Sequence, residues 1–142
     1  MTGDSDLVDS IGFDHVNLKT RDMTRAINFY VNVLGMRLVR AERDDREEIR
    51  FASLRFGNAL IDLQPNDGDW SAQQGGLNHI ALLIEPTDLN ALAEKFREMG
   101  VCVTEGPVRR QGAFGYGQAL YIQDPDGHGV KLKHYDWPMI AP

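Results

Sequence analysis

Two histidines in matching surroundings are the residues of this chain best suited to chemistry. His15 lies within residues 11–18 and His79 within residues 75–82. In both stretches a glycine precedes a short polar or acidic residue, the histidine, a branched apolar residue and, two positions later, a leucine. Imidazole nitrogens are ligands for divalent transition metals. The duplication therefore indicates two equivalent positions from which a pair of imidazoles could hold one ion.

A carboxylate and a lysine occupy corresponding places later in each half of the chain. Residues 60–64 and 130–133 alternate between apolar and polar side chains, which is the pattern of a strand with one buried face. The apolar side chains should face a helix, so Asp62 and Gln64 should face the opposite, concave side, together with Lys131. The same alternation places His15 and His79 on that side. Two imidazoles and the carboxylate of Asp62, brought together by pseudo-twofold packing, would suit a divalent transition metal.

The elements that must position these residues are predicted to occur twice in the same order. Each half contains a strand, a helix with an aspartate at its start and a glycine at its end, and then three strands. An internal repeat of this kind predicts an α+β fold of two βαβββ modules. We place the first module at residues 11–65, a polar, glycine-rich linker at 66–76 and the second module at 77–135. Residues 106–117, with four glycines and a proline, are predicted to form a loop.

Composition excludes several classes of partner. The chain has 142 residues, with 21 acidic and 15 basic side chains and a formal net charge of −6. Such a balance argues against nucleic acid as the main partner, because binding a polyanion requires an excess of lysine and arginine. No stretch approaches the roughly 20 apolar residues of a membrane span. Cys102 is the single cysteine, so an intrachain disulfide is excluded and a cytoplasmic location is favoured; we expect Cys102 to pack in a core.

Several segments together resemble the vicinal oxygen chelate superfamily, which includes glyoxalases, bleomycin-resistance proteins, fosfomycin-resistance proteins and extradiol dioxygenases. The matching segments are residues 13–18, 26–36, 77–82, 106–108 and the Asp-Pro-Asp-Gly turn at 124–127. The resemblance covers residues 11–135. It implies paired βαβββ modules that form a U-shaped, incompletely closed mixed sheet around a metal or ligand cavity, usually in a homodimer.

Carried over by position, the resemblance implies that His15 and His79 are metal ligands and that Asp62 takes the place of a carboxylate ligand. One position departs from the family pattern, because Lys131 stands where the catalytic branches have a glutamate. A protonated lysine beside a divalent cation costs Coulomb energy. Lys131 could therefore pair with Asp62, or lose its proton and act as a base. The alternative for the histidines is that they are polar residues of a hydrated pocket.

Further side chains are candidates for substrate binding. Tyr121 and Phe114 are expected to line a cavity wall, and Gln64 is a possible additional ligand. Arg110 could contact an anionic substrate or be a solvated loop charge. Trp70 is either a lid over the cavity or a hydrophobic contact at an interface.

These observations leave two functions open. The first is a metal-dependent enzyme, a glyoxalase-like lyase or isomerase or a dioxygenase, acting on a small oxygen-bearing substrate at a divalent Fe, Mn, Ni or Zn ion. His15, His79 and Asp62 would hold the ion, and Lys131 and Asp62 would be the catalytic residues. The second is a metal-free protein that binds a small molecule, as bleomycin-resistance proteins do. The paired histidines favour the first function and Lys131 favours the second.

Overall fold

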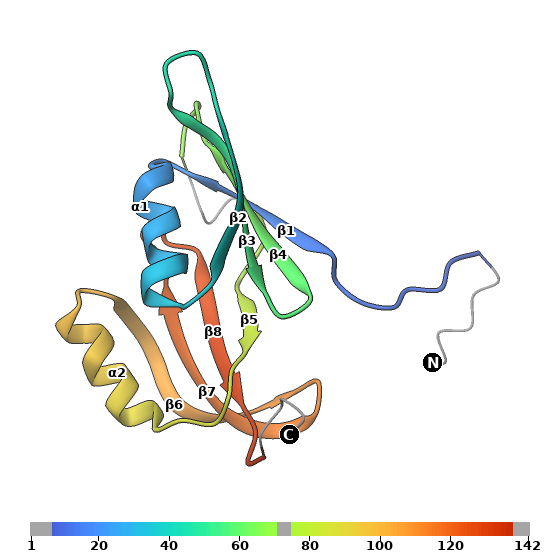
Figure 1. Ribbon diagram of the computed structural model, residues 1–142. Helices are drawn as coiled ribbons and strands as arrows, with labels where there is room; N and C mark the ends of the chain where they lie inside the picture. The colour runs from blue at the N-terminus through green and yellow to red at the C-terminus, as the bar shows by residue number, and fades with distance from the viewer. Residues whose placement is uncertain (1–6, 71–74, 138–142) are drawn as a thin grey trace. The chain divides into compact units, whose positions relative to one another are not determined.

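The computed structural model describes residues 7–70 and 75–137. The chain divides into two compact units, one ending at Asp67 and the other beginning at Gly68. No helix within these described residues is long and apolar enough to span a membrane. Each unit has its own sheet and its own helix (Figure 1).

The first unit contains a four-stranded mixed sheet covered on one face by a helix. Its elements in chain order are β1 (His15–Thr20), α1 (Met23–Asn28), the π-helical turn η1 (Phe29–Val33), β2 (Arg37–Arg43), β3 (Ile49–Phe56) and β4 (Ala59–Pro65). The strand order is β1-β4-β3-β2. β1 and β4 are parallel, and the other neighbours are antiparallel. The parallel pair brings the beginning and the end of the unit side by side.

Local chemistry fixes where α1 begins and where its π-helical extension ends. The carboxylate of Asp22 accepts a hydrogen bond from the Arg25 amide at 3.0 Å, which caps the first turn. Gly35, at a φ of +73°, takes the left-handed conformation that follows many helix ends. The buried side of the helix packs on β3 and β4. The core of this unit consists of Leu18, Met23, Ala26, Phe29, Tyr30, Met36, Ala52, Leu54, Ile61 and Leu63.

The second unit repeats this arrangement. Its elements are β5 (Ile80–Leu83), α2 (Leu89–Glu98), β6 (Cys102–Gly112), β7 (Gly115–Gln123) and β8 (Gly129–His134). The strand order is β5-β8-β7-β6, with β5 and β8 parallel. Asp88 caps α2 by accepting from the Ala91 amide at 3.1 Å, and α2 packs on β6 and β7. The core of this unit includes Leu82, Leu89, Ala93, Phe96, Leu120, Ile122, Val130 and Leu132.

The predicted fold class is therefore confirmed: the chain is an α+β protein of two βαβββ modules, and each sheet is open. Both predicted aspartate caps are present. The alternation along β1 and β4 also has the predicted direction. Leu18, Ile61 and Leu63 are buried with the helix, whereas His15 is on the opposite face with Asp62.

Two local expectations were wrong. Most of residues 106–117 are strand, because β6 extends to Gly112 and pairs with β7 through a tight hairpin. Cys102 is exposed at the start of β6 and does not pack in a core.

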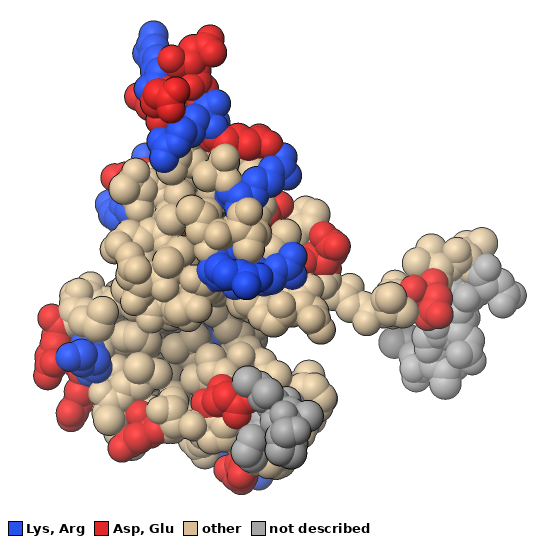
Figure 2. All heavy atoms as spheres, viewed as in Figure 1, with Lys and Arg blue, Asp and Glu red and all other residues tan. Residues whose placement is uncertain are grey.

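Charged side chains of both signs gather at the turn of the β2–β3 hairpin. Figure 2 shows both basic and acidic side chains over the far end of the β2–β3 hairpin. This turn contains Asp44 and Glu47, and Arg43 donates a hydrogen bond of 2.6 Å to the Glu47 carbonyl. The turn is a solvated feature of the first unit, distant in sequence from both histidines.

Candidate functional site

His15 is held at the start of β1 by the residue before it. Its Nδ1 lies 2.6 Å from Oδ1 of Asp14. An ionised carboxylate can only accept, so Nδ1 carries the donated proton and Nε2 is the free nitrogen of the neutral ring. Nε2 lies 3.8 Å from Oδ2 of Asp62. The ring thus presents its unprotonated nitrogen toward a carboxylate oxygen on the neighbouring strand.

Asp62 is oriented from the other side by β3. Ser53 is its cross-strand partner, and the Ser53 hydroxyl donates to Oδ1 of Asp62 at 2.6 Å. Asp62 is only 7% exposed and Ser53 only 4%. Because Oδ1 is engaged by the hydroxyl, Oδ2 is left facing His15. A buried carboxylate with one oxygen fixed and the other directed at an imidazole is suited to binding a cation.

The pKa of His15 is raised above its usual value of 6.5. The hydrogen bond to Asp14 is the largest cause, burial opposes it, and the charges of Asp62 and Asp14 add to the increase. The direction follows from the surroundings, since two nearby carboxylates favour the imidazolium. A metal at Nε2 would compete with that proton.

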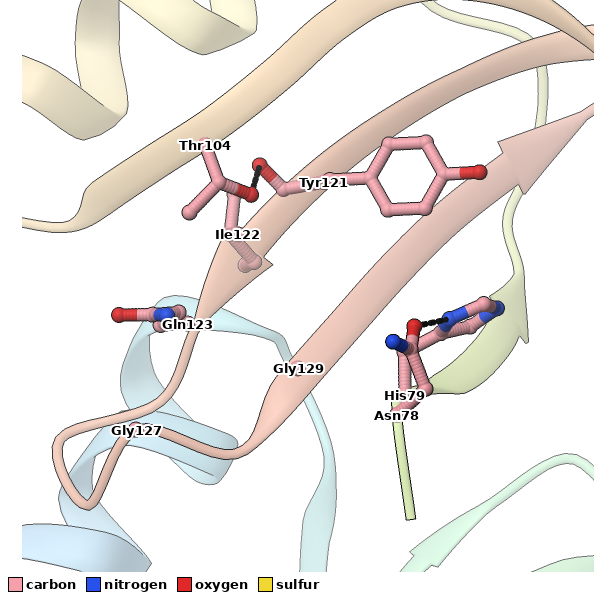
Figure 3. Close-up of a pocket in the computed structure, with 8 residues that line it drawn as sticks. All are labelled: Asn78, His79, Thr104, Tyr121, Ile122, Gln123, Gly127 and Gly129. Carbon is pink, nitrogen blue, oxygen red and sulfur yellow. Dashed lines mark hydrogen bonds between the residues drawn. The ribbon is translucent and has the colours of Figure 1, made fainter. Parts of the chain in front are cut away.

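His79 is held in the same way at the entrance of β5. Its Nδ1 lies 2.6 Å from Oδ1 of Asn78, so the ring donates from Nδ1 and Nε2 is again free (Figure 3). The ring makes an edge-to-face contact with Tyr121, with centroids 5.6 Å apart. A close backbone approach places this segment, because a Cβ on Gly129 would lie 2.4 Å from the Asn78 carbonyl oxygen. Only glycine fits there without displacement.

A cavity of about 230 Å³ lies beside His79, between the ends of β5, β6, β7 and β8 (Figure 3). Figure 3 shows the Tyr121 ring and the His79 ring on the side of the cavity opposite Gln123. The Thr104 hydroxyl donates to the Tyr121 carbonyl at 3.2 Å and ties β6 to β7 at the wall. The lining residues are Asn78, His79, Thr104, Tyr121, Ile122, Gln123, Gly127 and Gly129.

Lys131 lies next to this histidine and tyrosine. It is the cross-strand partner of both Tyr121 and Ala81. It is 8% exposed, and its Nζ lies 5.3 Å from the centroid of the Tyr121 ring, a cation–π distance. Tyr121 therefore contacts His79 and Lys131 at once. A protonated lysine cannot be a metal ligand, so this position does not fit the anionic ligand expected there.

The remaining candidates make other contacts. Gln64 accepts a hydrogen bond from Lys19 at 3.2 Å, and the Trp70 ring contacts His128 at 5.4 Å. Arg110 pairs with Glu105 at 2.5 Å near the β6–β7 hairpin. Phe114, at the tip of the hairpin, is 56% exposed and packs on Tyr135. Their proposed contacts with a substrate stay predictions.

Sequence reasoning missed the residues that orient the histidines and Asp62. Asp14 and Asn78 had a signal, since each precedes its histidine in the repeat. Gly129 had a weaker one, because a glycine beginning a predicted strand can mark a close backbone approach. Ser53 had none, because its role follows only from the register of β3 on β4.

The donor set was compared with the needs of a divalent metal. Among residues 7–70 and 75–137, no three histidine, cysteine or acidic side chains form a group that could hold an ion. His15 and Asp62 do form a suitable pair. Two atoms that each lie about 2.1 Å from an ion can be no more than about 4.2 Å apart. Nε2 and Oδ2, at 3.8 Å, satisfy this limit without movement. The pair therefore fits a divalent transition metal in donor type and spacing.

The comparison with known families agrees with this architecture. The model of the Glyoxalase/Bleomycin resistance protein/Dioxygenase superfamily matches residues 12–132. The chain belongs to this superfamily. The match spans both modules, including both histidines, Asp62 and Lys131.

Individual relatives cover most of the chain. A probable lactoylglutathione lyase from Synechocystis is 31% identical over 125 residues, which are 83% of this chain and 91% of the relative. An integron cassette protein from Vibrio cholerae is 28% identical and has a TM-score of 0.70, over 92% of this chain and 99% of that one. A fosfomycin resistance protein from Listeria monocytogenes, solved with Mn(II), shares the fold at 20% identity and a TM-score of 0.65, over 86% and 90% of the two chains. A protein of the same fold has thus been solved with a metal ion.

Proposed function

We propose that this superfamily member is a metal-dependent enzyme of the glyoxalase or dioxygenase type, acting on a small oxygen-bearing substrate. The proposed ligands of the divalent ion, Fe, Mn, Ni or Zn, are His15, Asp62 and His79. One observation carries the proposal. His15 and Asp62 each have one polar atom held by a neighbour, and their two free atoms face each other at 3.8 Å. Metal ligands are typically oriented by such outer hydrogen bonds.

The relatives support metal dependence more strongly than they support any one type of reaction. The probable lactoylglutathione lyase from Synechocystis has sufficient identity to support a lyase or isomerase. Lys131, however, occupies the last-strand position where the resemblance implies a glutamate. Glutathione-dependent isomerisation and extradiol cleavage both resemble chemistry that uses this glutamate. We therefore propose a substrate that chelates the metal, with a reaction in which Lys131 replaces the missing carboxylate.

The residues divide the proposed work between them. A bound divalent ion would supply a Lewis acid for the substrate oxygens. Asp14 and Ser53 keep His15 and Asp62 in place, and Asn78 does the same for His79. Lys131 would donate or accept a proton, or hold an anionic group. Its amine contacts the Tyr121 ring, which also contacts the His79 ring.

The test is metal analysis of untagged protein after incubation with Fe²⁺, Mn²⁺, Ni²⁺ and Zn²⁺ in turn. We expect about one ion per chain in the wild type and loss of the ion in His15→Ala and in His79→Ala, because ligand number sets affinity. His128→Ala is the matched control, since it removes an imidazole outside the proposed set and should keep the ion. A wild type that takes up none of the four metals would contradict the proposal.

A second candidate is a metal-free protein that binds a small molecule, and Lys131 is the observation that favours it. Its amine lies 5.3 Å from the centroid of the Tyr121 ring, which also contacts His79, so a positive charge adjoins one wall residue of the cavity. Tyr121, Phe114 and Trp70 would then supply the binding wall. Ligand binding that survives complete removal of metal by a chelator would favour this function.

We also propose a homodimer in the cytoplasm. The dimer follows from the resemblance, and the location from the single cysteine. Sedimentation velocity at several protein concentrations would detect the dimer.

A further inference from the structure

Two lysines of the second unit are buried on the same side of one strand. Lys131 is 8% exposed and Lys133 is 4% exposed, and both lie in β8. Residues two apart on a strand point to the same face and are separated by roughly 6.6 Å along it. Lysine is almost never fully buried without a partner. Two such residues side by side need a physical account.

Carboxylate partners do not supply it. Within the described part of the second unit, no acidic side chain forms an ion pair with either lysine. Glu105 is engaged by Arg110 at 2.5 Å. The chain as a whole has six more acidic than basic residues, yet the described residues of this unit give these amines no acid. Burying a charge without a counter-charge is costly, so binding an anion would offset that cost.

The two amines differ in how they are held. The Lys131 Nζ contacts the Tyr121 ring and makes no hydrogen bond. Every fully buried side-chain nitrogen among the described residues has a hydrogen-bond partner. The Lys131 Nζ is therefore not fully buried. Lys133 donates to the Arg110 carbonyl and lies 5.2 Å from the Tyr135 centroid. An ammonium has three donors, so both amines keep donors for a ligand.

Lys133 also lies in a field of like charge. Its pKa is lowered, first by burial and then by the charges of Lys131, Arg109 and Arg110. Arg109 stacks over the Tyr116 ring at 4.2 Å and has no described acid partner. Gly112 leaves the space that Lys133 occupies, since a Cβ there would lie 2.9 Å from Cε of Lys133. The fold therefore holds the positively charged side chains of Lys131, Lys133, Arg109 and Arg110 close together.

We propose that the amines of Lys131 and Lys133 form an oxyanion-binding site that holds a carboxylate, phosphate or phosphonate group of the substrate. This inference deepens the proposed function, because it gives the oxygen-bearing substrate a negative charge. Tyr121 joins this site to His79, since its ring contacts both Lys131 and that histidine. An anionic group bound at the lysines would thus leave the rest of a small substrate beside the histidine.

The experiment measures binding of inorganic phosphate and, separately, acetate to metal-free wild-type protein by calorimetry at low ionic strength. Lys131→Met and Lys133→Met keep the length of the side chain and remove the amine. Each should weaken binding roughly tenfold or more, as expected for loss of a charge-assisted hydrogen bond. Lys95→Met removes the same charge from an exposed position on α2 and should change neither affinity. Phosphate binding without acetate binding would assign the site to a doubly charged group.

A second measurement on the unmodified protein guards against variants that fail to fold. The lysine side-chain resonances report the pKa of Lys133 by NMR titration. Saturating phosphate should raise that pKa, because a bound anion favours the ammonium. A purely structural lysine would not respond.

Three results would overturn the inference: no anion binding by the wild type, equal anion affinity in wild type, Lys131→Met and Lys133→Met, or equal weakening in Lys95→Met. Metal-free protein is used so that the outcome is separate from the metal proposal. Loss of metal binding in His15→Ala with intact phosphate binding would support both. Intact metal uptake with no phosphate binding would remove only the oxyanion site.

Discussion

The two units place different chemistry on matching backbone positions. In the first, the residue before the histidine is Asp14, and the cross-strand pair on the following strands is Ser53 and Asp62. In the second unit the residue before the histidine is Asn78, and the corresponding pair is Tyr121 and Lys131. Every anionic or hydroxyl group of the first set has a neutral, aromatic or cationic counterpart in the second.

The duplicated fold thus fixes the positions of corresponding residues in the two units but does not fix their charges. Both histidines keep a hydrogen-bonded Nδ1 and a free Nε2. The neighbours of the two rings differ: His15 faces a carboxylate, and His79 contacts an aromatic ring that also contacts an amine. The first unit is suited to a cation and the second to an anion.

The largest expected effect comes from giving the first unit the charge of the second. Asp62→Lys should lower metal affinity by roughly 100-fold or more, because a ligand is lost and an ammonium faces Nε2 of His15. Asp62→Asn is the control, since its amide oxygen can still accept from Ser53 while the charge is gone; it should be intermediate. Titration against a chelating dye measures the change. Wild-type affinity in Asp62→Lys would remove Asp62 from the ligand set.

The reverse exchange should have the opposite sign. Lys131→Glu restores an anionic group on the last strand and removes a cation, so metal affinity should rise roughly tenfold, or about 1.4 kcal/mol. Phosphate binding should be lost in the same variant. Lys95→Glu makes the same charge change on α2 and should leave metal affinity unaltered. Weaker metal uptake in Lys131→Glu would show that the lysine supports the metal site.

A third variant tests the backbone feature that only the second unit has. Gly129→Ala should destabilise the protein by about 1–3 kcal/mol, because its Cβ would collide with the Asn78 carbonyl and displace His79. Gly12→Ala is the control, since a Cβ there would contact nothing within 4 Å. Urea unfolding followed by circular dichroism measures both. Equal stability of the two variants would mean that the strands separate easily.

The smallest effect concerns pH and the residue before His15. The interactions that raise the pKa of His15 stabilise the folded protein. Their contribution is complete below pH 6.5 and is lost as the pH rises through the raised pKa. Metal binding has the opposite dependence, because the imidazolium cannot coordinate. Asp14→Asn, which copies Asn78, should lower the His15 pKa in an NMR titration of metal-free protein. Asp9→Asn is the control; an unchanged pKa in Asp14→Asn would exclude Asp14 as the main cause.

Much of the fold was predictable from the sequence because local signals agreed with the final packing. Asp22 and Asp88 cap the helices that they were expected to cap, and Gly35 and Gly100 both take positive φ values at the ends. Strand alternation correctly placed His15 on the face of Asp62. These features depend on neighbours in sequence or on the two-residue period of a strand.

The largest error arose where glycine serves long-range packing. Residues 106–117 suggested a loop, yet Gly117 lies in β7, where a Cβ would be 2.2 Å from the His134 carbonyl oxygen. That contact joins segments far apart in the sequence and leaves no local pattern. Ser53 was missed for a similar reason, because its role depends on the strand register. The metal, oxyanion and substrate assignments stay predictions.

The parallel pairing of the first and last strands in each unit has a consequence for biogenesis. The histidine lies at the beginning of each unit and the charged partner on its last strand, so neither half-site can exist until the intervening helix and hairpin are in place. Contacts of such long sequence separation form late in folding. Occupancy by a cation or an anion would therefore favour the finished unit over partly folded chains, and ligand supply in the cell would influence how much protein survives proteolysis.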